Sequence, residues 1–246
     1  MAHFGVILLA AGKSTRFGGR EKKPFALLEG RPVFMRSTEH LVTRTEVVQS
    51  LLVVAGEDEE FVKRRYGANL MFMNIAVVIG GAERHESVAN ALAMIKSEIE
   101  FVAIHDTARP CVTTEQIDNV FNAAKTHGAA ILAAPVMETV KRVNNAHAIT
   151  ETVDRTGLWL AQTPQVFKRE WITSAYEQRG KLGKGITDDA QLVEALGHQV
   201  HVVEGSPSNI KITKHSDMFL AEAILKSQPK PKTSGPAHPF AAEAQW

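Results

Sequence analysis

The 246-residue sequence contains a single cysteine, Cys111, and almost no net charge, with 28 lysines and arginines against 27 aspartates and glutamates. One cysteine excludes an intrachain disulfide and suits a reducing compartment. A formal net charge of +1 provides no overall basic surface for a nucleic acid or an anionic membrane. No apolar run is long enough to span a membrane, and the opening MAHFGVILL lacks the basic stretch and the apolar length of a signal peptide. The sequence therefore predicts a cytoplasmic protein without nucleic-acid or membrane partners.

Residues 1–226 have the composition of one globular domain. Apolar residues make up 44% of the chain and charged residues 22%, and the length is sufficient for one large core. Residues 227–246, SQPKPKTSGPAHPFAAEAQW, are too rich in proline and small side chains to pack. We expect this C-terminal tail to be disordered.

Apolar runs typical of buried strands alternate with helical patterns along the first half of the chain. Strands are expected at 6–9, 47–55, 70–79, 101–104 and 129–134. Helices are expected at 32–44, from 57 to Gly67, from Glu86, and from a capping box at Thr113 to Gly128. The alternation predicts an α/β, Rossmann-like fold: a mostly parallel sheet with helices on both faces and ligands at the carboxyl ends of its strands.

The alternation breaks after Pro135. Residues 136–143 and 149–153, joined by an Asn-Asn turn, have the pattern of a protruding hairpin, so 136–155 is predicted to form a β-arm. A lone hairpin is marginal in water, and its apolar residues need a cover, which favours a homodimer formed through the arm. The remaining elements are expected to be helices from Lys168 and after Thr187, strands at 199–203 and 209–213, and a helix capped by Ser216.

The stretch 6–23, VILLAAGKSTRFGGREKK, joins the first strand to a loop rich in glycine and cations. Ala10, Ala11 and Gly12 have almost no side chain, so backbone amides can approach a ligand, and the cations that follow suit a polyphosphate. GKS at 12–14 looks like the end of GxxxxGK[ST], but the position of the first glycine is Ile7, inside the strand. The alternative is an ordinary strand-to-helix turn with a solvated basic face.

Seven short motifs occur in a fixed order: AAGxxxR at 10–16, GGxxRxxSV at 80–88, HDxARP at 105–110, APVxxTVKR at 134–142, TVDRxxLWxAQTPQ at 152–165, TDDA at 187–190 and NIKIT at 209–213. Together they resemble the 2-C-methyl-D-erythritol 4-phosphate cytidylyltransferases over about nine-tenths of the chain. Each motif alone is weak, but the ordered set is specific. The resemblance implies transfer of CMP from CTP to methylerythritol phosphate, with release of pyrophosphate, in non-mevalonate isoprenoid precursor synthesis.

The chemistry of that reaction predicts a site built from lysine and arginine. A phosphate monoester is already ionised at neutral pH, so the enzyme has to align two anions and neutralise charge. By resemblance, the catalytic residues are Arg16, Lys23, Arg155 and Lys211. The nucleotide contacts are Ala10, Ala11, Gly12, Gly81, Ser87, Asp106 and Arg109, and the contacts to the second substrate are Thr139, Lys141, Arg155 and Thr163.

Two departures from the family pattern affect these assignments. The family usually continues Lys-Gln after its loop, whereas here Lys23 precedes Pro24, with Lys22 alongside. We assign the triphosphate contact to Lys23, because its spacing to Gly30 matches the family and a residue before proline is held extended. Lys22 remains the alternative. Ala82 occupies a position where the family often has aspartate, which removes one polar contact near the nucleotide.

We expect Mg²⁺ as a cofactor, held mainly by the CTP phosphates and water, with Asp106 as an indirect participant and no direct ligand assigned. Asp188 and Asp189 begin a helix, where the dipole favours acidic side chains without any metal. Cys111 lies near His105 in the sequence, but no oxyanion motif accompanies it, so a buried thiol is expected there.

Two other functions share much of this pattern. A ribitol-5-phosphate cytidylyltransferase would have the same sheet and loop, but TVKR and VDRxxLW resemble the methylerythritol enzymes better. A non-catalytic nucleotide-binding regulator would be indicated by loss of Arg16, Lys23 or Lys211, and all three are present. The partners expected are therefore CTP, a phosphorylated polyol and a second copy of the chain.

Overall fold

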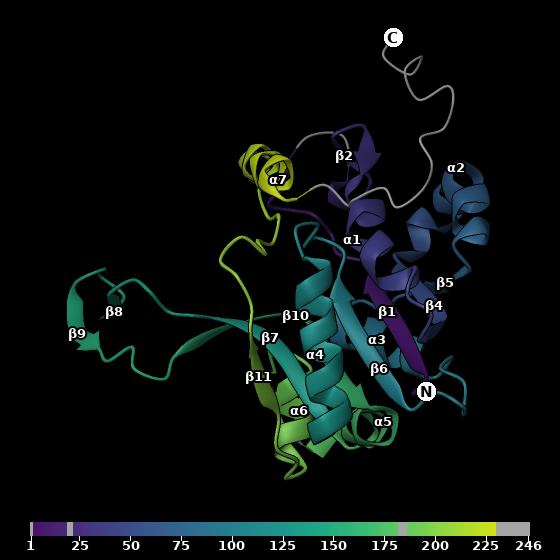
Figure 1. The fold of residues 1–246 in the computed structure, drawn as a ribbon. Coiled ribbons are helices and arrows are strands. Elements are labelled where there is room, and N and C mark those ends of the chain that lie inside the picture. Colours follow the sequence, from purple (N-terminus) through teal and green to yellow (C-terminus); the bar gives the residue numbers. More distant parts are fainter. Residues whose placement is uncertain (1, 19–21, 182–185, 230–246) are drawn as a thin grey trace.

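The computed structural model describes residues 2–18, 22–181 and 186–229 (Figure 1). Its centre is a seven-stranded sheet in the order β11-β7-β10-β6-β1-β4-β5, in which only β10 runs antiparallel to its neighbours. The strands are β1 (Phe4–Leu9), β4 (Val47–Val54), β5 (Ile75–Ile79), β6 (Phe101–Asp106), β7 (Ala129–Pro135), β10 (Trp159–Lys168) and β11 (His201–Glu204). The expected mostly parallel α/β sheet is confirmed.

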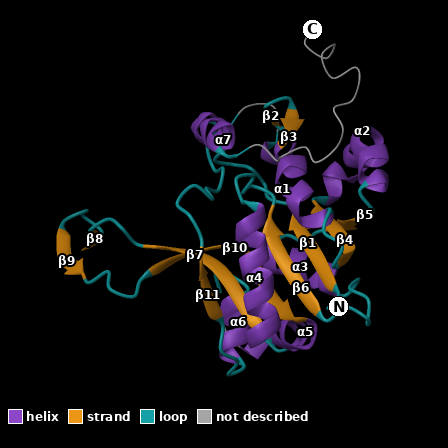
Figure 2. Cartoon of the chain, in the orientation of Figure 1, coloured by secondary structure: helices purple, strands orange, loops and turns teal. Residues whose placement is uncertain are grey.

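Helices cover both faces of this sheet, because its central strands are apolar on both sides (Figure 2). Along β1, Val6 and Leu8 pack on one face with α1, α2 and α4, whereas Ile7 packs on the other with α3, α5 and α6. The helices are α1 (Val33–Val42), α2 (Glu59–Phe72), α3 (Arg84–Leu92), α4 (Thr114–His127), α5 (Arg169–Glu177), α6 (Ala190–Ala195) and α7 (Ser216–Ser227).

The segment between β1 and α1 is short and irregular. It contains the 3-10 turn η1 (Lys23–Phe25) and the small antiparallel pair of β2 (Leu27–Leu28) and β3 (Arg31–Pro32). Two further 3-10 turns, η2 (Gly56–Asp58) and η3 (Arg179–Lys181), precede α2 and follow α5. Together with α7, the β1–α1 segment forms a third apolar cluster, in which Phe17, Ile212 and Met218 are buried.

The hairpin is confirmed and stands away from the sheet (Figure 1). β8 (Val140–Val143) pairs antiparallel with β9 (Ile149–Val153), so its first strand begins four residues later than expected. The side-chain oxygen of Asn144 accepts hydrogen bonds from the amides of Ala146 and Ala148 at 2.9 and 3.0 Å, which closes the turn. Ile149 is 63% exposed, so its apolar surface is uncovered within one chain.

Two boundaries around α2 were predicted wrongly. Gly67 does not end the helix, which continues to Phe72, and β5 begins at Ile75 rather than at residue 70. Val62, Tyr66 and Leu70 are buried at successive spacings of four, and this packing outweighs the cost of about 1 kcal/mol for one helical glycine.

Three further expectations near the C-terminal half need correction. Residues 159–168 form the long strand β10, which was not predicted. Residues 209–213 form no strand of any sheet, although the amide of Ile212 donates to the carbonyl of Ala108 at 2.8 Å. Ser216 does not cap α7; the carboxylate of Asp217 instead accepts from the amides of Thr213 and Lys214, at 2.7 and 2.8 Å.

Most of the expected C-terminal tail lies outside the residues that the structure describes. Ser227 still belongs to α7, and the side-chain amide of Gln228 donates to the carbonyl of Cys111 at 2.8 Å. Residues 230–246 fall outside the described residues. No helix within the described ranges has both the length and the hydrophobicity of a membrane span.

Gly128 lies where the end of α4 contacts Trp171 of α5 and provides a test of the packing there. It ends α4 in the left-handed region, at φ 88°, after a capping box in which Thr113 and Gln116 bond each other's amides. A Cβ at Gly128 would lie 2.4 Å from the Trp171 ring. Gly128→Ala should therefore lower the free energy of unfolding by about 2–4 kcal/mol, measured by urea denaturation.

The control is Gly67→Ala, because a Cβ there meets nothing within 4 Å. This substitution should leave stability unchanged or raise it by up to about 1 kcal/mol. Equal urea midpoints for the two variants would contradict the role assigned to the contact between Gly128 and Trp171.

Candidate active site

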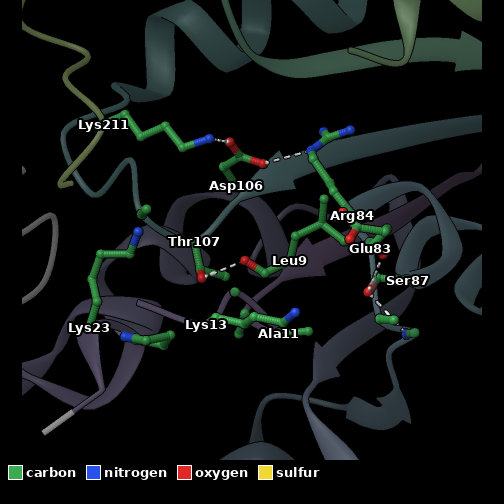
Figure 3. Close-up of a pocket in the computed structure, with 16 residues that line it drawn as sticks. Leu9, Ala11, Lys13, Lys23, Glu83, Arg84, Ser87, Asp106, Thr107 and Lys211 are labelled. Atoms are coloured by element: carbon green, nitrogen blue, oxygen red, sulfur yellow. Dashed lines mark hydrogen bonds and ion pairs between the residues drawn. The ribbon is translucent and has the colours of Figure 1, made fainter. Parts of the chain in front are cut away.

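A cavity of about 450 Å³ lies at the carboxyl ends of β1 and β6 (Figure 3). This is the edge of the sheet where a parallel α/β fold places its ligands. The wall is formed by the chain after β1, the start of α3, the residues after β6, and two lysines from more distant segments. The lining residues are Leu9, Ala10, Ala11, Gly12, Lys13, Lys23, Pro24, Gly81, Ala82, Glu83, Arg84, Ser87, Asp106, Thr107, Ala108 and Lys211.

Small side chains let the loops of β1 and β5 meet at the cavity. A Cβ on Gly80 would lie 2.9 Å from that of Ala11, and a Cβ on Gly81 would lie 2.3 Å from that of Glu86. The Ser87 hydroxyl accepts from the amide of Gly81 at 3.1 Å and donates to the carbonyl of Glu83 at 3.2 Å. Gly81 and Ser87, both expected to bind nucleotide, therefore lie side by side. The Ser87 hydroxyl also holds the loop before α3 in place.

The cation-rich loop folds back on itself, which brings Lys23 to the cavity. The Ser14 hydroxyl accepts from the amide of Lys23 at 3.2 Å and donates to the carbonyl of Gly12 at 3.3 Å. Lys22 is engaged elsewhere, with its amine 2.8 Å from carboxylate oxygens of both Glu57 and Asp58. This arrangement supports assigning the triphosphate contact to Lys23, which we retain as a proposal.

Three predicted cations act on one another at this site. Burial lowers the pKa of Lys23, and the charges of Lys211 and Arg16 lower it further, against the opposing effect of Asp106. Arg16 is exposed and does not line the cavity. Because an anion relieves repulsion among cations, this cluster is suited to polyphosphate.

Asp106 is the carboxylate at the centre of the cavity wall. Its Oδ2 accepts from Lys211 Nζ at 2.5 Å, and its Oδ1 lies 3.5 Å from Arg84 Nε (Figure 3). Burial alone would raise its pKa, but the charges of Arg84 and Lys211 outweigh burial and hold the pKa of Asp106 well below its usual range. Asp106 is therefore ionised at neutral pH.

Thr163 lies beneath Asp106 rather than in the cavity. Its hydroxyl accepts from the amide of Asp106 at 3.0 Å and lies 3.0 Å from His105 Nδ1. His105 Nε2 lies 3.3 Å from the carbonyl of Arg109, which can only accept. Burial lowers the pKa of His105 from 6.5 to about 4. The neutral imidazole therefore carries its proton on Nε2, and the Thr163 hydroxyl donates to Nδ1.

Arg109 supports the segment that carries Lys211. Its guanidinium donates to the carbonyl of Asn209 at 2.6 Å, and the Asn209 side chain donates to Gln162 Oε1 and the Thr163 carbonyl at 3.0 and 3.1 Å. Arg109 is not among the cavity-lining residues, so its expected contact with nucleotide stays a prediction.

The arm residues expected to bind the second substrate lie outside this cavity. Thr139 is exposed, Lys141 donates to the Thr152 hydroxyl at 2.6 Å, and Arg155 donates to the carbonyl of Met137. None of the three lines the cavity of its own chain. The site described here therefore contains the predicted nucleotide loop without the predicted arm contacts.

Arg84 was not singled out from the sequence, although GGxxRxxSV contains it. The helix α3 begins at Arg84, two residues earlier than expected, after a capping box between Glu83 and Glu86. Arg84 donates to both carboxylate oxygens of Asp189, at 2.9 and 2.7 Å. Arg84 lies in the motif GGxxRxxSV and Asp189 in the motif TDDA, so both could have been selected as site residues. No sequence pattern, however, shows that two residues 105 positions apart form a pair.

Among the described residues, the carboxylates near the cavity form no preassembled metal cage. No group of three or more histidine, cysteine, aspartate or glutamate side chains within the described ranges could hold a metal. Asp188 accepts from the Gln165 side chain at 2.9 Å, and Asp189 is paired with Arg84. Burial raises the pKa of the Cys111 thiol to about 12, which agrees with an inert cysteine.

Comparison with known proteins identifies the family of this chain. Residues 4–227 match the family described as IspD: 2-C-methyl-D-erythritol 4-phosphate cytidylyltransferase. The chain belongs to this family. The protein of that name from Rhodopirellula baltica is 42% identical over 236 residues, covering 91% of this chain and 95% of the relative. Its counterpart from Alkaliphilus metalliredigens is 38% identical over 227 residues, covering 91% and 93%.

Solved structures of the family have the same fold. The 4-diphosphocytidyl-2C-methyl-D-erythritol synthase of Anaerococcus prevotii superposes with a TM-score of 0.78 at 29% identity, covering 92% of this chain and 99% of that one. The 2-C-methyl-D-erythritol 4-phosphate cytidylyltransferase of Thermus thermophilus gives 0.74 at 29% identity, covering 89% and 98%. The chain is thus an enzyme of the nucleotidyltransferase class.

The buried His105 predicts a pH dependence of stability. Its folded pKa, about 4, lies below the ordinary 6.5, so below pH 6.5 the unfolded chain binds a proton that the folded protein does not. Stability should therefore fall by roughly 2–3 kcal/mol between pH 7 and 4.5 through this group. The ionised form of Asp106 also stabilises the fold, but that stability is lost only as the pH falls to about 3.8, the ordinary pKa of aspartate, and below. Asp106 therefore adds little to the change between pH 7 and 4.5.

Urea denaturation at both pH values measures this contribution. His105→Gln should lose less stability on acidification than the wild type does, whereas His147→Gln, at an exposed position on the arm, should keep the full dependence. If all three proteins lose the same free energy, another group causes the pH effect.

Proposed function

We propose that the chain transfers CMP from CTP to the phosphate of 2-C-methyl-D-erythritol 4-phosphate, giving 4-diphosphocytidyl-2-C-methyl-D-erythritol and pyrophosphate. The observation that carries this proposal is the cavity in which Lys23, Arg84 and Lys211 surround one ionised carboxylate, Asp106, beside a floor of small residues. The family membership gives the substrate class, and the cavity provides the charges that two phosphorylated substrates require.

The reaction needs alignment and charge neutralisation rather than a base. An oxygen of the substrate phosphate forms a bond to the α-phosphorus of CTP, while the bond to the bridging oxygen breaks and pyrophosphate leaves with the electron pair. Arg16 and Lys23 would stabilise the charge that moves onto the leaving group, and Lys211 would hold the incoming phosphate. His105 is buried outside the cavity lining, so it takes no part as a base.

Lys211 already has one partner at this site. Its amine is bonded to Asp106 at 2.5 Å, and its proposed role also requires contact with phosphate. Its side chain lines the cavity and is 41% exposed, so the amine can move from Asp106 to phosphate without unpacking the core. We infer that an arriving phosphate takes Lys211 from Asp106 and frees one carboxylate oxygen.

The residues present suit Mg²⁺ bound through substrate. Asp106 is ionised and faces the cavity, and a magnesium site commonly combines one or two carboxylates with phosphates and water. Asp106 and the CTP phosphates would hold the ion, and when bound it would neutralise charge on the α-phosphate and the leaving group. The low pKa of Asp106 keeps that ligand available at neutral pH.

We further propose that two chains form a dimer by exchanging arms. Within one chain Met137 is 65% exposed and Ile149 is 63% exposed, and such apolar surface favours a partner. The exchange would bring Thr139, Lys141 and Arg155 of each arm to the cavity of the other subunit. A two-fold arrangement of this kind is the commonest among soluble oligomers.

A pyrophosphate-release assay tests the reaction. With CTP and Mg²⁺, methylerythritol phosphate should give a kcat/KM at least about tenfold above that of ribitol 5-phosphate, because the two polyols differ in branching and length. Excess chelator should abolish turnover. Equal turnover of both polyols, or full turnover with chelator, would contradict the proposal.

Two lysine variants control for nonspecific loss of charge in that assay. Lys23→Ala should lower kcat by about 10²-fold or more, as loss of a transition-state contact does. Lys22→Ala, whose amine is paired with Glu57 and Asp58, should change kcat by no more than about threefold. A larger effect at Lys22 than at Lys23 would reverse the assignment.

The shared site predicts complementation between inactive subunits. Arg16→Ala and Arg155→Ala should each be inactive, but a mixed dimer has one site with both defects and one with neither. Mixing them should restore up to about a quarter of wild-type activity, since random pairing makes half of the dimers mixed and each has one intact site. Subunit exchange shown by mass spectrometry without recovery of activity, or full activity in a monomer, would contradict the exchange of arms.

A further inference from the structure

Arg84 is held from behind by a buried carboxylate. About a third of its side chain, 34%, remains exposed at the cavity, whereas the side chain of Asp189 is completely buried. The two guanidinium nitrogens Nη1 and Nη2 donate to the two oxygens of Asp189, at 2.9 and 2.7 Å. Paired bonds of this geometry fix the plane of the guanidinium as well as its position.

Tyr176, on α5, fixes that carboxylate in turn. Its hydroxyl donates to Asp189 Oδ1 at 2.5 Å. Burial and the charge of Asp189 raise the pKa of Tyr176 well above its ordinary range, so the phenol stays protonated and remains a donor. The amide of Asp189 donates to Gln165 Oε1 at 3.2 Å, which anchors the backbone. The side chain of Asp189 thus accepts three hydrogen bonds.

Stability alone is a weak reason for such an arrangement. A buried ion pair often contributes no more to stability than apolar residues of the same volume, because both charges lose their hydration. The pair is instead directional: the third guanidinium nitrogen of Arg84, Nε, lies 3.5 Å from Asp106 Oδ1. The position of Arg84 therefore affects the carboxylate at the centre of the cavity (Figure 3).

We propose that Tyr176 and Asp189 are positioning residues for catalysis: Tyr176 holds Asp189, Asp189 holds Arg84, and Arg84 keeps Asp106 oriented toward the cavity. The proposal rests on the cytidylyl transfer proposed above. Asp189 takes both Nη groups of Arg84, so only Nε faces Asp106, at 3.5 Å from Oδ1. Asp106 then keeps its Oδ2 side for Lys211 in the free enzyme, and this oxygen is freed when substrate phosphate takes Lys211 during turnover.

Loss of the Tyr176 hydroxyl should therefore shift the charged side chains of Asp189 and Arg84 without removing a charge from the site. Small displacements of groups that act in the transition state reduce the rate, whereas the small residues and backbone that would receive CTP in the ground state do not contact Tyr176. Tyr176→Phe should lower kcat by about five- to tenfold and leave the KM for CTP within about twofold of wild type. The chain has one other tyrosine, Tyr66, buried in α2 on the other face of the sheet, so Tyr66→Phe is a matched control with unchanged kcat.

A double-mutant cycle separates positioning from a general structural role. If Tyr176 acts through Arg84, its substitution should change kcat by less than about twofold in an Arg84→Lys background, which keeps a cation for Asp189. A structural role would give the same fold-loss in both backgrounds. If Arg84→Lys does not fold, Asp106→Asn serves as the background, because the proposed chain of contacts ends at that residue.

The outcomes are distinct. Normal wild-type turnover with an unaffected Tyr176→Phe, or equal losses in the two backgrounds, would overturn the inference alone. A wild type that releases no pyrophosphate from CTP and methylerythritol phosphate would overturn the proposed function and the inference with it. A kcat loss that vanishes in the Arg84→Lys background would establish the positioning role.

Discussion

The ionised carboxylate of Asp106 is the interaction on which the site depends. It lies at the carboxyl end of β6, between Lys211 and Arg84, and it is almost completely buried. A buried carboxylate without partners would be protonated or would destabilise the fold, so the cations around it are required by the fold as well as by the chemistry. The same cations are the groups that two phosphorylated substrates need.

The antiparallel strand β10 is what supports this arrangement. It lies between β6 and β7, and it places Thr163 under the amide of Asp106 and Gln165 against the start of α6. Its Gln162 also holds Asn209, which precedes the segment carrying Lys211. This strand thus connects Asp106, Lys211 and Asp189. Changes to the polar residues of β10 should affect the positions of all three.

Sequence patterns predicted the sheet well, because apolar alternation and the capping box at Thr113 are local signals. They missed β10, whose Gln162, Thr163 and Gln165 are buried and polar, because each is satisfied by a partner distant in sequence. The motif resemblance named eight of the residues that line the cavity, while Arg16, Arg109 and Thr163 lie outside the lining. The pairing of Arg84 with Asp189 depends on the tertiary fold and has no local signature. Residues 209–213 were taken as a strand because alternation alone does not show whether a neighbouring strand is available to pair.

A crystal structure with CTP, Mg²⁺ and a nonreactive analogue of methylerythritol phosphate would show directly whether substrate phosphate takes Lys211 from Asp106. Lys211 Nζ should leave its position 2.5 Å from Asp106 Oδ2 and contact phosphate, while Arg84 stays bonded to Asp189. A complex in which the ion pair of Lys211 and Asp106 is intact and the phosphates bind elsewhere would contradict this exchange.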